Sequence, residues 1–294
     1  SDLQFTQDMT GLIDQYVVGV DARNIAGSNQ TNNLGTNGSV TAVNYGQGQQ
    51  TFYGLLGQLK SKADSFPLET TLAARLDQWN SQTPTSYNAG LSGTPVYQNV
   101  SNQSKTQLSP TLGLLYKMNR DWDLRSAAYQ AFHAPGMNNT LRSYGSGNGY
   151  SFANPNLTPE TMTGYEVGTD YRWRGGFAQL TAFNNYINNA ITSYKITSAN
   201  AGFANSLCSA SGIAGCVSNV GGSGYTNVNY YTNQQNLLSR GIEVQYHHDV
   251  NPNWALDGGY SYTRTVLTWS ATSDPINTQV SGVPKNMANA GVTY

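Results

Sequence analysis

Hydrophobic and polar residues alternate along much of the chain, in segments of about ten or more residues that are longer than average soluble strands. Between positions 164 and 173, aromatic and β-branched residues at the odd positions alternate with small or charged residues at the even ones. This period of two gives each strand an apolar face and a polar face. The pattern predicts about ten strands. They fall within 16–22, 50–61, 71–77, 108–117, 122–132, 165–173, 177–189, 241–247, 254–263 and 287–294.

The connections between these segments alternate between short and long. Short connections cover 62–66, 119–121, 174–176 and 249–253, and the last one carries an Asn-Pro turn signal. Long connections, rich in Asn, Gly, Ser, Thr, Tyr and Gln, cover 23–49, 80–106, 133–160, 196–236 and 267–284. Tight turns at one end of an antiparallel meander and long loops at the other are typical of an outer-membrane barrel. The expected fold class is therefore all-β, a partial antiparallel transmembrane β-barrel with about ten strands of a larger barrel.

The composition excludes several classes of protein. Its 16 acidic and 15 basic residues leave a formal charge of -1, so nucleic acid is not an expected partner. Charged residues make up only 11% of the chain, against about 25% in an ordinary soluble domain. Aromatic residues also reach 11%, which argues against a disordered chain. No stretch approaches the roughly 18 uninterrupted apolar residues of a membrane-spanning helix.

The two cysteines, Cys208 and Cys216, lie together in a stretch rich in Ser, Gly and Ala, without a second cysteine pair or a nearby histidine. A local disulfide in an oxidising compartment fits this spacing better than a zinc site does.

No group of residues indicates an enzyme. The three histidines, His133, His247 and His248, are not accompanied by a G-x-S-x-G nucleophile motif. Strand alternation places His247 and His248 on opposite faces, which disfavours a shared metal site. The glycine-rich stretch 144–150 lacks the Lys-Ser/Thr of a phosphate-binding loop. We therefore expect no catalytic residue, no metal site and no cofactor.

Several short motifs occur in order along the later part of the chain. The stretch 108–136 contains a predicted strand, a tight turn and a second strand, and it ends in Phe-His-Ala-Pro at 132–135 followed by a glycine. NPNLTPET follows at 154–161, YEVG at 165–168, FNNYINNAI at 183–191, NLLSRGIEVQY at 236–246, YSYT at 260–263 and VPK at 283–285. This series resembles the barrel of TonB-dependent outer-membrane receptors, whose corresponding motifs include Phe-Arg-Ala-Pro and Asn-Pro-x-Leu-Lys-Pro-Glu. His133 and Thr158 depart from that pattern. The resemblance covers roughly positions 51 to 294 and is strongest from 108 onward.

The resemblance implies an importer in the bacterial outer membrane. Barrels of this family have roughly 22 strands around a plugged lumen. Such receptors bind a scarce nutrient complex at their extracellular loops and are energised through the plug by the TonB complex. The implied partners are outer-membrane lipid, the TonB energising complex, and a ferric siderophore or similar nutrient complex. No plug domain or recognisable terminal strand is found in the sequence, so residues 1–294 are expected to be part of one β-barrel domain. The alternatives are a passive porin-type channel and a soluble secreted all-β binding protein.

Three sets of residues are candidates for a role. Aromatic and cationic residues at the loop ends suit an aromatic, anionic metal chelate, and the candidates for ligand contact are His133, Arg142, Tyr144, Tyr150, Tyr230 and Tyr231. Polar residues of the predicted inner face are expected to line the lumen or contact the plug, and these are Arg75, Asp77, Arg125, Glu166, Asp170, Arg172, Glu243 and Asp257. Aromatic residues close to the short turns are predicted to form an interfacial girdle, and these are Tyr116, Trp122, Tyr171, Trp173 and Trp254.

Overall fold

A computed structural model of the protein describes residues 1–34, 37–62, 66–90, 96–98, 102–142, 144–146, 149–196, 227–270 and 275–294. Cys208 and Cys216, the predicted disulfide pair, lie outside the described residues. The strands along the main path of the sheet are β1 (Asp2–Asp8), β2 (Gln15–Leu34), β3 (Val40–Lys62), β4 (Leu68–Gly90), β6 (Gln103–Lys117), β7 (Trp122–His133), β10 (Glu160–Trp173), β11 (Gly176–Ile196), β12 (Asn227–Asn251), β13 (Trp254–Ser270) and β14 (Asn286–Thr293). Three short strands, β5 (Val96–Gln98), β8 (Tyr144–Ser146) and β9 (Gly149–Phe152), and one short helix, α1 (Met137–Leu141), lie between them.

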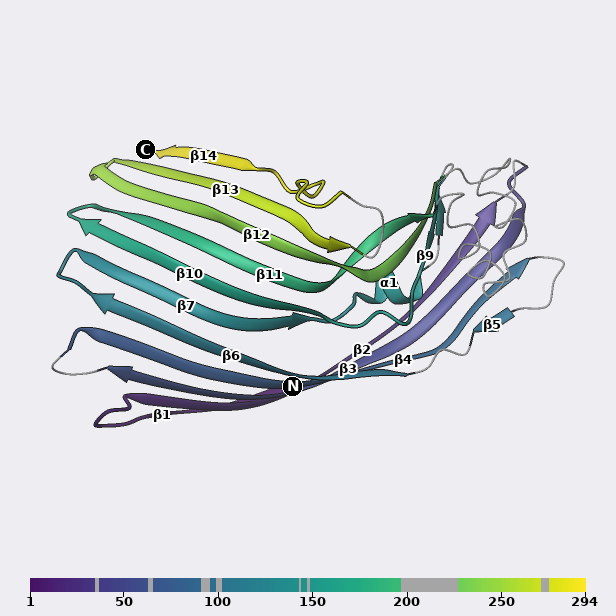
Figure 1. Cartoon of the computed structure of the whole chain (residues 1–294), viewed down its shortest axis with the longest axis horizontal. Coiled ribbons are helices and arrows are strands. Elements are labelled where there is room, and N and C mark those ends of the chain that lie inside the picture. Colours follow the sequence, from purple (N-terminus) through teal and green to yellow (C-terminus); the bar gives the residue numbers. More distant parts are fainter. Residues whose placement is uncertain are drawn as a thin grey trace.

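The eleven strands of the main path follow one another in chain order, and each neighbouring pair is antiparallel. Figure 1 shows them side by side as one long, curved sheet, with the tight turns together at one end and the longer connections at the other. β1 and β14 are the two edges of this path, so the described strands form an open part of a barrel wall. None of the described helices is long and apolar enough to cross a membrane.

The predicted strands and the short connections at 119–121, 174–176 and 249–253 are confirmed, whereas the predicted long loops are too long. The connection predicted at 62–66 lies mostly outside the described residues. All ten predicted strands are present, and β1 is an additional one that was missed because it contains only two large apolar residues, Leu3 and Phe5. The prediction of loops at 23–49, 80–106, 196–236 and 267–284 is wrong in part. β2 continues to Leu34, β4 continues to Gly90, β12 begins at Asn227 and β13 continues to Ser270. The extended part of β2 is polar or small at nearly every position, so hydrophobic alternation cannot reveal it.

The two faces of the sheet are the reverse of those of a soluble protein. The large apolar side chains are the exposed ones, with Val167 60%, Leu55 53% and Tyr165 52% exposed. Charged side chains of the opposite face, such as Asp77 and Asp123, are buried. An apolar outer surface with polar groups inside is the arrangement that a barrel wall in lipid requires.

Aromatic rings form a row on the outer face close to the tight turns. Trp122 of β7 stacks on Tyr171 of β10, with ring centroids 4.4 Å apart, and Tyr171 lies 5.4 Å from Trp173. The row continues onto β12, where the ring of Tyr246 lies 5.7 Å from that of Trp173. Trp254 pairs with Tyr294 at 4.6 Å. Rings of this kind sit at the level where lipid headgroups meet the hydrocarbon.

Candidate functional site

The residues between β7 and β10, 134–159, are here called the crossing segment. α1, within this segment, contacts β2 and β3, although β4 and β6 separate those strands from β7 in the sheet. β9, later in the same segment, pairs in parallel with the first residues of β12 on the other side of β10 and β11. A connection that contacts strands on both sides of its own position in a curved sheet must pass over the concave face of that sheet. The crossing segment therefore lies inside the curve of the wall, at the loop end.

Glycines on β2 and β3 let the first half of the crossing segment approach closely. A Cβ atom at Gly46 would collide with the backbone oxygen of Leu141, and one at Gly48 would lie 3.0 Å from a methyl group of that leucine. A Cβ at Gly27 would lie 3.3 Å from the terminal methyl of Met137. Only glycine leaves room for a second backbone at such a distance. Leu141 itself is buried against this surface.

The second half of the crossing segment is attached to β12 through side-chain amides. Asn154 Nδ2 donates to the hydroxyl of Tyr230 at 2.8 Å and to the carbonyl oxygen of Tyr231 at 2.9 Å. Asn233 accepts a hydrogen bond from the backbone N–H of Thr158 at 2.9 Å and donates to the carbonyl of the same residue at 2.8 Å. The crossing segment is thus fixed at both of its ends.

Ion pairs cover the concave face of the first strands. Arg75 of β4 contacts Asp77 on the same strand at 2.8 Å and Asp21 of β2 at 2.7 Å. Register places Gly54 of β3 directly between Asp21 and Asp77, and the Arg75 guanidinium lies over that glycine, where a Cβ atom would collide with it. Arg75 on β4 can therefore reach Asp21 on β2, because the strand between them, β3, carries a glycine at this position.

The same arrangement occurs twice more on β7. Arg125 pairs with Asp170 at 3.0 Å and donates from Nη2 to the Thr181 hydroxyl of β11 at 2.6 Å, passing over Gly168. Tyr129 donates to Glu166 at 2.6 Å and contacts Asn185 of β11 at 3.1 Å, and its ring occupies the space where a Cβ of Gly164 would lie. The side chains of Arg125 and Tyr129 therefore lie along the sheet, and each is hydrogen-bonded both to the neighbouring strand β10 and to β11 beyond it.

All of the residues predicted to line the lumen lie along this concave face. Arg172 pairs with Asp123 at 2.6 Å, and Asp257 lies 2.8 Å from the Nδ1 atom of His247. Glu243 lines a cavity of about 420 Å³ together with Arg125 and Glu166. The sequence did not indicate the partners Asp21, Asp123, Tyr129, Thr181 and Asn185, because pairs between strands depend on register.

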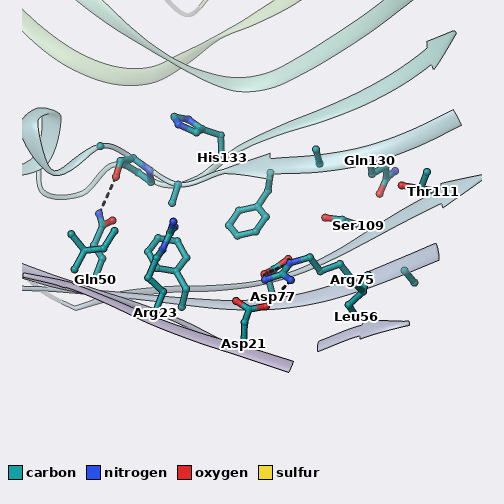
Figure 2. Close-up of a pocket in the computed structure, with 18 of the residues that line it drawn as sticks. Asp21, Arg23, Gln50, Leu56, Arg75, Asp77, Ser109, Thr111, Gln130 and His133 are labelled. Atoms are coloured by element: carbon teal, nitrogen blue, oxygen red, sulfur yellow. Dashed lines mark hydrogen bonds and ion pairs between the residues drawn. The ribbon is translucent and has the colours of Figure 1, made fainter. Parts of the chain in front are cut away.

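A large cavity on the concave face lies between the wall and the first residues of the crossing segment. Its volume is about 830 Å³, and Figure 2 shows residues of β2, β3, β4, β6 and β7 around it. The Arg75–Asp21–Asp77 cluster lies on one side, and Gln50 donates a hydrogen bond to the Pro135 carbonyl oxygen on another. His133, whose side chain is 73% exposed, lies at the edge, 3.1 Å from Glu160.

Three of the residues predicted to contact a ligand come together at the loop end. The Arg142 guanidinium lies 4.7 Å from the centre of the Tyr144 ring, and Tyr144 lies close enough to Tyr231 to affect the pKa of its hydroxyl. Burial, reinforced by Tyr144, raises the pKa of Tyr231, so this hydroxyl remains a hydrogen-bond donor. Arg142, Tyr144 and Tyr231 are here called the loop cluster.

The other predicted ligand contacts lie elsewhere. The Tyr230 hydroxyl accepts the hydrogen bond from Asn154, and burial raises its pKa. His133 is at the edge of the large cavity. The backbone of Tyr150 pairs with Val228, and its side chain lies outside the described part of the structure. Among the described residues, no group of three His, Cys, Asp or Glu side chains could hold a metal ion.

A family model for the β-barrel of TonB-dependent receptor-like proteins matches residues 1–294. The chain belongs to the TonB-dependent receptor β-barrel family. The expected fold class and resemblance are thereby confirmed. No curated protein sequence matches the chain.

Solved structures of this family share the fold. The ferric yersiniabactin uptake receptor FyuA from Yersinia pestis is similar with a TM-score of 0.70 and 14% identity, over 99% of this chain and 38% of that receptor. The copper transporter OprC has a TM-score of 0.66 and 14% identity, over 97% of this chain and 40% of the transporter. The ferric-catecholate import receptor Fiu from K12 E. coli has a TM-score of 0.60 and 17% identity, over 100% of this chain and 41% of the receptor. The chain thus spans about two fifths of the length of these TonB-dependent receptors.

Proposed function

We propose that this chain is part of the barrel wall of an outer-membrane receptor that imports a ferric siderophore with energy from the TonB complex. The loop cluster is the observation that carries the proposal. It presents a cation stacked on an aromatic ring next to a phenol that stays protonated, at the end of the sheet where the long connections lie. Such a surface suits an anionic chelate with aromatic groups.

Two further observations support an importer of this class. The outer face exposes its large apolar side chains, which suits lipid contact and disfavours a soluble binding protein. Two structurally similar receptors take up iron chelates, ferric yersiniabactin and ferric catecholates. The passive porin is the second candidate, because a polar concave wall also suits a water-filled channel. The crossing segment disfavours a passive porin, because this segment occupies the space inside the curved wall.

The test is iron uptake by a Gram-negative host from which the full-length receptor has been deleted and then restored. We expect restoration to increase the uptake of radioactive iron supplied as ferric siderophores, and a protonophore to abolish this increase. Uptake that persists with the protonophore would indicate a passive channel instead. No increase with any ferric siderophore would exclude the proposed cargo.

The loop cluster is tested in the same cells. Arg142→Ala is expected to lower the rate of uptake at limiting siderophore, because it removes the cation of the cluster. Arg120→Ala, in the tight turn between β6 and β7, removes an equal charge at the opposite end of the wall and is the matched control. Equal uptake by the two variants would remove the loop cluster from the ligand site.

A further inference from the structure

Two arginines lie next to each other on the outer face of the wall. Register places Arg240 of β12 directly opposite Arg264 of β13. Two positions nearer the tight turn on each strand, Ile242 and Tyr262 are also directly opposite each other, and both belong to the exposed apolar face. Because side chains two positions apart on a strand point to the same side, the two arginines lie on that face as well. Like charges in directly opposed positions repel each other.

The wall supplies no negative charge to this pair. Within the described part of the structure, neither arginine forms an ion pair. The acidic residues of β12 and β13 lie elsewhere, on the concave face or near the tight turn, and these are Glu243, Asp249 and Asp257. Arg264 donates from Nη2 to the backbone carbonyl oxygen of Asn277 at 3.4 Å, which occupies one of its five N–H donors. The two charges therefore call for an anion from outside the wall.

The pair lies where the exposed apolar band of β13 ends. Arg264 is ten positions beyond Trp254, which lies near the tight turns. A tilted strand crosses the hydrocarbon of a membrane with about 9 to 11 residues, so Arg264 reaches the headgroups of the leaflet at the loop end. Two positions further along, Val266 is only 2% exposed and forms a β-bridge with Gln279. Protein, and not lipid, covers β13 at that point.

A phosphate group matches the chemistry of these side chains. Each guanidinium offers a planar fork of N–H donors that fits phosphate oxygens, and a phosphate between the two would offset their mutual repulsion. Asn184 of β11 lies directly opposite Arg240 on its other side, so its side-chain amide is a further donor on the same face.

We propose that Arg240 and Arg264 bind the phosphate of an anionic lipid in the leaflet at the loop end of the wall. This lipid site is on the outer face, on the other side of the sheet from the cavity and the crossing segment. It goes beyond the proposed function and does not depend on the cargo of the receptor.

The experiment follows the unfolding temperature of the purified full-length receptor in neutral detergent as lipid A, a glycolipid with two phosphates, is added. Lipid A is expected to raise this temperature, and lipid A without its phosphates is expected to raise it much less. Arg240→Ala and Arg264→Ala should each increase the half-saturating concentration of lipid A about fivefold, the effect of one basic residue at an anionic membrane surface. Arg174→Ala, at the tight turn between β10 and β11, removes the same charge at the other end of the wall and should leave that concentration unchanged.

A second measurement separates lipid binding from a structural role of the arginines. Without lipid A, each alanine variant should unfold at the temperature of the wild type or above it, because the repulsion between the two charges is gone. Arg240→Lys keeps the charge and loses the planar fork, so its response to lipid A should lie between those of the wild type and Arg240→Ala.

Four results would overturn the lipid site. Both alanine variants would respond to lipid A as the wild type does, or the wild type would respond equally to the lipid without phosphates, since the acyl chains alone would then be bound. The alanine variants would unfold below the wild type without lipid, which would mean that the arginines stabilise the wall itself. Inorganic phosphate would raise the unfolding temperature as far as lipid A does, which would assign the pair to free phosphate. A response to lipid A that requires both arginines supports the site, whether or not the receptor imports iron.

Discussion

The side-chain amide of Gln50 on β3 donates a 2.9 Å hydrogen bond to the backbone carbonyl oxygen of Pro135, 85 positions further along the chain. Both residues are buried. This bond joins the crossing segment to a strand that is not adjacent to β7 in the sheet, so it ties two parts of the wall together across the concave face.

Gln50→Ala is expected to destabilise the receptor by about 1 to 3 kcal/mol, because it leaves the Pro135 carbonyl buried without a donor. The measurement is the temperature at which the full-length receptor in detergent loses its compact form on SDS gels. Gln49→Ala, the exposed neighbour on the other face of β3, is the matched control and should leave this temperature unchanged. An equal decrease of this temperature in both variants would mean that the hydrogen bond between Gln50 and Pro135 does not account for the stabilisation.

Gly164→Ala is expected to destabilise the receptor by about 1 to 3 kcal/mol through overpacking, since the new methyl group would overlap the Tyr129 ring. Gly57→Ala is the control, because its Cβ would have no neighbour within 4 Å. Urea unfolding followed by tryptophan fluorescence compares the variants. Adding Tyr129→Ala to Gly164→Ala should restore part of the loss, and a double variant less stable than Gly164→Ala would contradict the overlap.

Val167→Arg is expected to cost about 2 to 4 kcal/mol of folding free energy in lipid, the range for a cation on the lipid face of a barrel. Val167 is on the exposed apolar face of β10. Gln179→Arg, on the concave face of β11 beside Glu166 and Glu243, introduces the same charge and should be tolerated. The folded fraction in lipid vesicles at increasing urea measures both. Similar tolerance of the two arginines would mean that the apolar face does not meet lipid.

Arg75→Gln is expected to destabilise the wall by about 1 to 3 kcal/mol, because it leaves the buried carboxylate of Asp77 without its cation. The Arg75 side chain is 36% exposed, so the cost stays below that of breaking a fully buried pair. Arg174→Gln at a tight turn is the control, and the same urea unfolding is the measurement. Replacing Asp77 by Asn in the Arg75→Gln background should recover stability. A further loss in that double variant would refute the explanation.

The strands could be predicted from the sequence where one face is apolar and the other polar, as in β10 and β13. The prediction stopped where that contrast stops, in the outer halves of β2 and β3, which are held by backbone pairing from Asn24 and Thr51 to Leu34 and Val40. The path of the crossing segment could not be predicted. The glycines of β3 that leave room for it, Gly46 and Gly48, cannot be distinguished in the sequence from ordinary loop glycines.

The sequence predicted which residues face the lumen, but it did not predict which of their side chains form ion pairs or hydrogen bonds with one another. Arg75 and Asp77 are two positions apart and were both expected on the inner face, yet Asp21 joins them only through the register of β2, β3 and β4. The association of Tyr144 with Tyr231 depends in the same way on the parallel pairing of β9 with β12. Their role in ligand contact stays a prediction.

The glycines beneath Arg75, Arg125 and Tyr129 have a thermodynamic consequence for whatever meets this wall. Long polar side chains ordinarily lose rotamer entropy when a partner immobilises them, at about 0.5 to 1.5 kcal/mol each. Here Arg125 and Tyr129 are already ordered, because each is held by a neighbouring strand and by the strand beyond it. Their entropy is lost when the sheet folds and not when it binds. A partner that binds this preorganised surface therefore costs less ordering entropy, so a given set of contacts yields a higher affinity than it would with mobile side chains.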